Sequence, residues 1–286
     1  MEKSRAVVFL VLILIPGVYF HAFAQPSDEG ITKETLVFGV LPVVSAEKLV
    51  TRFAPLVEYL EKHLKKQVLL ETAPNYTEFV RRTRGNRYDI LFTAPHFYYL
   101  AQREINHRVI VRVDAPIMQA VIVVPKDSKI TSLQDLRGKQ LATVDPISLA
   151  TVLVRDRLLS AGLDPDKDLT LVATPSHNAS LLSAYKEITD AASLMGTPLR
   201  GARKEVRESV RILAKTAGTP HMPISLAPTI SASDAKIIAE IFVSLKSSKE
   251  GRIVLKKIGW PGLVKASPSE YDTLEPLAQQ IFPLLQ

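Results

Sequence analysis

Six residues that carry a hydroxyl or an imidazole group stand where a predicted strand ends and a helix begins. They are Ser45, Tyr76, Thr93, Ser148, Ser176 and His177. In open α/β sheets the strand ends form the usual ligand site, and the unpaired N–H groups of a helix start attract anions. All six side chains can donate hydrogen bonds, so their recurrence at several strand ends predicts a polar site for an anion.

A plainer interpretation is that these residues only stabilise the fold. Serine and threonine in front of a helix are first of all caps. Tyr76 suits a packing role as well, and His177 suits a capping or surface role. Both interpretations stay open at the level of the sequence.

Catalysis has little support in the sequence. The chain has no cysteine, no G-x-S-x-G or H-E-x-x-H motif and no glycine-rich phosphate loop. The histidines beyond the first predicted helix are too scattered to indicate a metal site: His96, His107, His177 and His221. We therefore expect a protein that is not an enzyme and that binds neither a metal nor a cofactor.

The first 24 residues have the pattern of a secretory signal peptide. Lys3 and Arg5 precede an apolar run, and the small residues at 22–24 offer a cleavage point after Ala24. Pro16 and Gly17 interrupt the run, which is shorter than the roughly 18–20 apolar residues of a membrane span. Because no cysteine stands at the cleavage point, a lipid anchor is excluded. We expect a periplasmic protein without stable membrane insertion after the signal is removed.

The charge of the chain fits a small anionic ligand better than nucleic acid. The formal net charge is +7, and loss of Glu2, Lys3 and Arg5 with the signal removes a net +1, which leaves about +6. Nucleic-acid binding normally needs a concentrated basic stripe with stacking aromatic residues. Here the basic clusters are interleaved with glutamates and few aromatics, as on an ordinary solvated surface.

Short apolar strands alternate with amphipathic helices along the chain, which predicts βαβ units and mostly parallel sheets. Proline-punctuated boundaries near Pro125 and Pro220 predict two lobes, the second inserted into the first. Two lobes joined by two crossings form a cleft that closes on a ligand by hinge motion. The expected lobes are residues 34–124 plus 218–286, and residues 125–217.

At these motifs the sequence resembles a known family. The carrying segments include FGVLPVVS, APNYTEFVRRTRGNRYDILFTAPHFYYLA and SLQDLRGKQLATVDPISLAT, and they follow in order over almost the whole mature chain. They are similar to the periplasmic substrate-binding proteins of phosphate, phosphite and phosphonate ABC transporters, which have the type II two-lobe α/β fold. The resemblance implies that the protein captures a small oxyanion and delivers it to an inner-membrane ABC permease.

The resemblance also implies particular site residues. Tyr76 matches the tyrosine of an A-P-x-Y turn that contacts the ligand, and Ser148 matches the first residue of an S-T-S-G turn that grips phosphonate oxygens. His177 matches a histidine that follows a glycine, which Ser176 replaces here. Asp190 matches an acidic residue that begins the following strand.

Two departures from the family pattern leave the ligand open. Leu149 and Ala150 replace two hydroxyl residues of the S-T-S-G turn, which makes the expected pocket drier. Residues 92–94, Phe-Thr-Ala, replace an aromatic-Tyr-Gly strand end. Either backbone N–H groups hold the anion, or the ligand carries an apolar portion, or the anion site serves another ligand.

An alternative function is a periplasmic sensor that binds a non-phosphonate ligand and reports to a membrane histidine kinase. Neighbouring permease and ATPase genes would indicate transport, whereas a kinase gene would indicate sensing. Under either function we expect Tyr76, Ser148 and His177 to face one another across or within the cleft.

Overall fold

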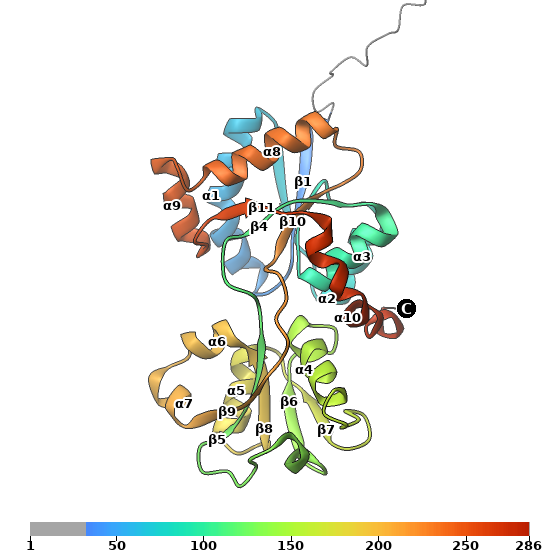
Figure 1. The fold of residues 1–286 in the computed structure, drawn as a ribbon. Coiled ribbons are helices and arrows are strands. Elements are labelled where there is room, and N and C mark those ends of the chain that lie inside the picture. Colours follow the sequence, from blue (N-terminus) through green and yellow to red (C-terminus); the bar gives the residue numbers. More distant parts are fainter. Residues whose placement is uncertain (1–32, 286) are drawn as a thin grey trace, which may run out of the picture.

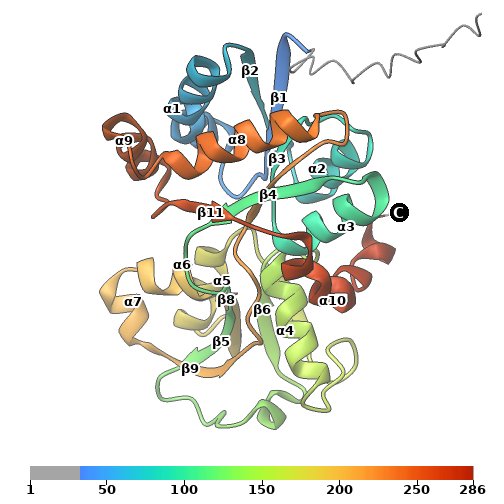
Figure 2. The ribbon, with the colours of Figure 1, turned by 45° about the horizontal axis from the view of Figure 1, so that its top comes forward.

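The protein consists of two α/β lobes, and the chain crosses between them twice (Figures 1 and 2). The computed structural model describes residues 33–285. The predicted signal peptide, residues 1–24, and its cleavage point after Ala24 lie outside the described residues. Over residues 33–285, no helix combines the length and the apolar character that a membrane span needs.

The first lobe is built on a six-stranded sheet to which both ends of the described chain contribute, in the order β11-β4-β10-β3-β1-β2. Buried side chains of β1 and of the apolar face of α1 share one core cluster, in which the rings of Phe38 and Phe53 lie 6.3 Å apart. The elements of this lobe are β1 (Thr35–Val40), α1 (Ala46–Leu64), β2 (Gln67–Glu71), α2 (Tyr76–Arg84), β3 (Ile90–Phe92), α3 (Pro95–Ile105), β4 (Arg108–Val113), β10 (Pro223–Leu226), α8 (Ala232–Ser244), α9 (Lys249–Ile258), β11 (Leu263–Lys265) and α10 (Glu275–Gln279), with 3₁₀ helices at Pro268–Leu274 and Phe282–Leu284.

The second lobe is built on a five-stranded sheet in the order β7-β6-β8-β5-β9. Its central strands β5 and β8 are buried, and both α4 and α5 pack against them. The elements of this lobe are β5 (Ala120–Pro125), a 3₁₀ helix (Leu133–Leu136), β6 (Gln140–Thr143), α4 (Leu149–Leu159), β7 (Thr170–Ala173), α5 (His177–Tyr185), β8 (Ala191–Met195), α6 (Gly196–Gly201), α7 (Lys204–Glu208) and β9 (Val210–Lys215).

Both sheets are mixed, although most strands of each sheet run in one direction. Strands β1, β2 and β3 are parallel, as are β6, β7 and β8, but β10 and β5 pair antiparallel with both of their neighbours. The reason is topological. Each of these two strands carries the chain into a lobe from the other lobe, and it therefore runs opposite to the strands of the βαβ units.

The expected boundary after residue 124 falls inside β5, a strand of the second sheet, so the first crossing comes earlier, at residues 114–119. The return crossing, residues 216–222, contains the other expected boundary. Met118 and Thr219 pair where the crossings run side by side, through two backbone hydrogen bonds of 2.9 Å each. Pro125 does not mark the crossing. It is the last residue of β5 and lies at the end of the strand away from the crossing.

The two lobes are in contact through a continuous apolar cluster. Phe97 of α3, Ile147 and Leu149 at the start of α4, and Ile281 near the C-terminus all belong to it. Helix α10 contacts both α3 of the first lobe and α4 of the second, and it lies close to α4 in Figures 1 and 2. Leu149 and Ala150 are therefore buried between the lobes rather than exposed at a helix start.

Buried histidines make the stability of the fold dependent on pH. Burial lowers the pKa of both His96 and His107 from 6.5 to about 4. Below pH 6.5 the unfolded chain binds protons that the folded chain does not, so stability is full above this pH and falls toward pH 4. From pH 7.5 to pH 5, each of the two should lower the free energy of unfolding by about 2 kcal/mol.

Urea unfolding at a series of pH values measures this loss. The variant His107→Gln cannot take up the proton, and it should lose about 2 kcal/mol less than the parent over the same interval. Equal losses in the two proteins would show that His107 is not a cause of the pH dependence.

Candidate ligand-binding site

The first lobe presents three helix starts at one edge of its sheet, because β1, β2 and β3 are parallel and lead into α1, α2 and α3. Ser45 precedes α1, is exposed and makes no capping hydrogen bond with its side chain. Tyr76 is the first residue of α2 and is partly buried. Thr93 follows β3 and is completely buried.

The second lobe presents the starts of α4 and α5 in the same way. The backbone N–H and the hydroxyl of Thr174 both donate to the carbonyl oxygen of Thr143, over 2.8 and 2.7 Å. These bonds hold the turn after β7 beside the turn after β6. Ser148, Ser176 and His177 therefore share one edge of the second sheet.

Tyr76 of the first lobe interacts electrostatically with the turn before α4 of the second lobe. Burial, and after it the negative charge of Asp145, raises the pKa of the Tyr76 phenol to about 12. Asp145 belongs to the turn before α4, where its carboxylate accepts a hydrogen bond from the backbone N–H of Ile147 over 2.9 Å. The phenol of the first lobe thus lies within electrostatic reach of the second lobe, and it keeps its proton as a hydrogen-bond donor at neutral pH.

Two of the candidate serines are helix caps. The Ser148 hydroxyl accepts from the backbone N–H of Thr151 over 3.3 Å and donates to the Thr151 hydroxyl over 3.1 Å. The Ser176 hydroxyl accepts from the N–H of Ala179 over 3.1 Å and is exposed. The capping interpretation describes the observed bonds of both serines.

His177 begins α5 with a neutral, half-buried ring. Burial lowers its pKa to about 4, so the ring carries no charge at neutral pH. Its Nδ1 atom is buried and has no hydrogen-bond partner among residues 33–285. A neutral imidazole with an unused nitrogen suits a ligand contact better than a capping role.

Asp190 is separated from the other candidates. It precedes β8, and its carboxylate accepts from the backbone N–H of Gln140 over 2.8 Å and pairs with Lys139 at 3.5 Å. Because β6 and β8 are parallel, Asp190 lies at the edge where these strands begin, whereas Ser148 lies beyond the edge where β6 ends. A five-residue strand separates the two edges by about 16 Å, so the structure does not bring Asp190 to Ser148.

His96 belongs to the junction, although the sequence pointed to it only as one of several scattered histidines. It is the second residue of α3, it is fully buried, and its Nε2 lies 2.9 Å from the carbonyl oxygen of Ile147 in the second lobe. Its Nδ1 and the nearby Thr93 hydroxyl have no hydrogen-bond partner within the described chain. The available signal was its place in a strand-to-helix turn, Thr93-Ala-Pro-His-Phe97.

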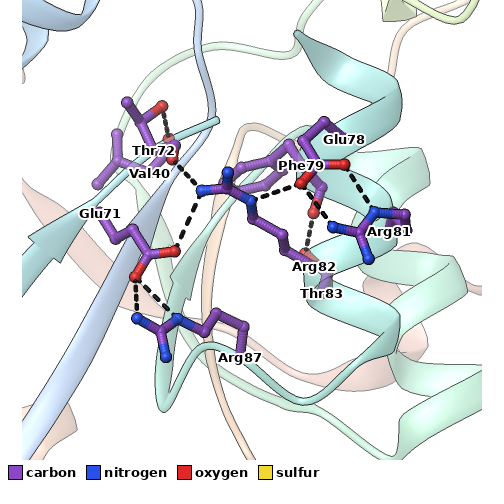
Figure 3. A network of polar contacts seen from close by, with 9 residues as sticks. All are labelled: Val40, Glu71, Thr72, Glu78, Phe79, Arg81, Arg82, Thr83 and Arg87. Atoms are coloured by element: carbon purple, nitrogen blue, oxygen red, sulfur yellow. Dashed lines mark hydrogen bonds and ion pairs between the residues drawn. The ribbon is translucent and has the colours of Figure 1, made fainter. Parts of the chain in front are cut away.

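A polar network braces the turn that carries Tyr76 (Figure 3). Arg82 of α2 donates to the carbonyl oxygen of Thr72 over 2.9 Å and to the carboxylates of Glu71 and Glu78 over 3.2 and 2.8 Å. The Thr72 hydroxyl donates in turn to the carbonyl oxygen of Val40 over 2.7 Å. The end of β2 is thereby tied both to β1 and to α2, and the turn between β2 and α2 is held at both ends.

A separate cavity of about 430 Å³ lies beside this junction, between α4 with β7 and the C-terminal segment. Thr151, Arg155 and Leu171 line it on the side of the second lobe, and Gln280 and Leu284 line it on the other side. Within the described chain no group of three or more His, Cys, Asp or Glu residues has an arrangement that would hold a metal ion.

Two mixed α/β sheets, two crossings and helix starts that meet between the lobes define the two-lobe type II fold. The family model for the periplasmic substrate-binding proteins of phosphonate ABC transporters matches residues 38–271, which is most of the chain. The protein belongs to this family. The predicted family and two-lobe fold are confirmed, and because the family consists of binding proteins, the chain is not an enzyme.

Characterised relatives are similar over most of their length. The phosphonates-binding periplasmic protein of Escherichia coli K12 is 22% identical over 266 residues, which cover 89% of this chain and 79% of the relative. A binding protein of an ABC phosphonate transporter from Pseudomonas aeruginosa has a TM-score of 0.72 at 19% identity over 85% of each chain. PhnD1 from Prochlorococcus marinus, solved in complex with methylphosphonate, has a TM-score of 0.75 at 17% identity over 87% of this chain and 98% of that one.

Replacing Arg82 with methionine should lower the free energy of unfolding by about 1–3 kcal/mol, because the Thr72 carbonyl loses its donor and Glu71 and Glu78 each lose one of their two arginine partners. Arg81→Met is the matched control, since Arg81 is exposed and, among residues 33–285, pairs only with Glu78 on its own helix. It should cost at most about 0.5 kcal/mol. Urea unfolding followed by the fluorescence of the single tryptophan, Trp260, measures both values. Equal losses would show that the network does not brace the turn.

Proposed function

We propose that this substrate-binding protein captures a small tetrahedral oxyanion, either a phosphonate, phosphite or phosphate, between its lobes and delivers it to an inner-membrane ABC permease. The observation that carries the proposal is the meeting of donors from both lobes at one junction, with the protonated phenol of Tyr76 beside the turn that opens α4. Family membership supports a phosphonate-type ligand.

The proposed contacts come from both lobes. Tyr76 and Thr93 of the first lobe donate their hydroxyl hydrogens to the oxyanion. The N–H groups of Leu149 and Ala150 do the same from the second lobe, because the first turn of a helix has no carbonyl to pair with them. Neutral His177 completes the set. Ser148 and Ser176 act mainly as caps that fix the two helix starts, and exposed Ser45 lies at the rim.

Apolar side chains at the start of α4 favour an oxyanion that carries an apolar group. Leu149 and Ala150 are buried, with 6% and 1% of their surface exposed, and they belong to the cluster between the lobes. They leave backbone N–H groups for the anion and an apolar surface for the rest of the ligand. A small alkylphosphonate suits this surface better than phosphate, whose four oxygens all need polar partners.

Capture requires that the lobes open and close. Residues 114–119 and 216–222 are the proposed hinge, since they alone carry the chain between the two sheets within the described range. Capture also takes place in the periplasm, after removal of the signal peptide at Ala24.

A panel of ligands added to the signal-free protein tests the proposal. Methylphosphonate, phosphite, phosphate and sulfate are compared by thermal unfolding, and a specific ligand at 100 times its Kd should stabilise the fold by about 2.7 kcal/mol. The isosteric variant Tyr76→Phe should raise the Kd about 10-fold or more, because a hydrogen bond to a charged group is lost. If no oxyanion changes the unfolding temperature, the ligand class is wrong. If Tyr76→Phe binds as tightly as the parent, the ligand lies elsewhere.

A further inference from the structure

The imidazole of His96 makes a hydrogen bond between the two lobes, and its second nitrogen has no hydrogen-bond partner among residues 33–285. Its Nε2 lies 2.9 Å from the carbonyl oxygen of Ile147, which precedes α4 of the second lobe, while His96 itself begins α3 of the first lobe. The ring is fully buried and lies against Phe97, with 4.2 Å between the ring centroids. The second nitrogen, Nδ1, is buried as well.

The bond to Ile147 decides which nitrogen carries the proton. A carbonyl oxygen can only accept a hydrogen bond, so Nε2 must be the protonated nitrogen. Burial lowers the pKa of His96 to about 4, so the ring stays neutral at neutral pH. In a neutral imidazole the other nitrogen is an acceptor. Nδ1 of His96 is thus a buried acceptor for which residues 33–285 supply no donor.

Two neighbouring groups indicate what the missing donor belongs to. The Thr93 hydroxyl, three residues earlier in the same turn, is also completely buried and unpaired within the described chain. The carboxylate of Asp145 lies within electrostatic reach of Tyr76 at the same junction. An acceptor and a hydroxyl donor on one strand-to-helix turn complement an acid group that has one protonated and one ionised oxygen. A carboxylate at the same junction, that of Asp145, disfavours a second negative charge on that group.

We propose that His96 Nδ1 accepts a hydrogen bond from a protonated oxygen of the ligand, so that the site selects a monoanionic oxyanion bearing an O–H and rejects isosteric anions without one. This inference rests on the proposed function and names the chemical feature by which the site chooses its substrate. An anion without a proton leaves Nδ1 buried and unpaired, and its lone pair faces an ionised oxygen.

Methylphosphonate and methanesulfonate provide the matched pair of probes. They have the same tetrahedral shape and the same methyl group, but at pH 6 the phosphonate is largely a monoanion with one O–H, whereas the sulfonate has none. Isothermal titration calorimetry of the signal-free protein should give a Kd about 10- to 100-fold lower for methylphosphonate.

Two variants separate the acceptor from the bond that joins the lobes. His96→Leu removes both and should weaken the binding of both ligands, but it should weaken methylphosphonate more and bring the ratio of the two Kd values close to one. His96→Gln keeps an amide donor for Ile147 and a carbonyl acceptor, so it should keep the preference for methylphosphonate even where both affinities fall.

Each outcome supports or overturns the inference. Equal affinities in the parent protein, or a parental ratio in His96→Leu, overturn the role of His96 while the proposed function stands. If His96→Leu does not fold, loss of the preference in folded His96→Gln overturns it in the same way. If neither ligand binds the parent, the proposed ligand class fails and the role of His96 fails with it.

Discussion

The hydrogen bond between His96 Nε2 and the Ile147 carbonyl oxygen joins the lobes at the point where their helix starts meet. Its geometry requires that α3 and the turn before α4 approach within hydrogen-bond distance, and the apolar cluster around Phe97, Ile147 and Leu149 supplies the contact that brings them there. The bond also fixes the tautomer of a buried imidazole. Under the proposed function, the same bond couples closure of the two lobes to the chemistry of the proposed site between them.

The direction of the strands explains why the candidate residues gather at this place. Parallel strands of both lobes end toward the junction, and every helix that follows one of them begins there. The strands that carry the chain in from the other lobe, β5 and β10, must run the opposite way, and they make both sheets mixed. Tyr76, Thr93, His96 and His177, from distant parts of the sequence, thus all lie where a strand ends and a helix begins.

Sequence patterns predicted the features that depend on local periodicity, and missed those that depend on how the lobes meet. Alternation of strands and helices gave the two lobes, but it could not reveal that β5 enters the second sheet, because a buried strand looks the same in either lobe. Asp190 matched a family position, yet its strand begins at the far edge of the sheet. Leu149 and Ala150 are unusual residues for an anion-binding helix start, and their burial in the apolar cluster that spans both lobes explains them. His96 could not be singled out because its partner, Ile147, is 51 residues away in the chain.

A crystal structure of the signal-free protein with methylphosphonate tests most directly whether the ligand is held between the lobes by His96. The predicted result is a ligand between the starts of α2, α3 and α4, with one oxygen about 2.6–3.2 Å from His96 Nδ1 and the His96–Ile147 hydrogen bond intact. A ligand in the separate cavity lined by Thr151 and Gln280, or a ligand that makes no contact with His96, would contradict this account.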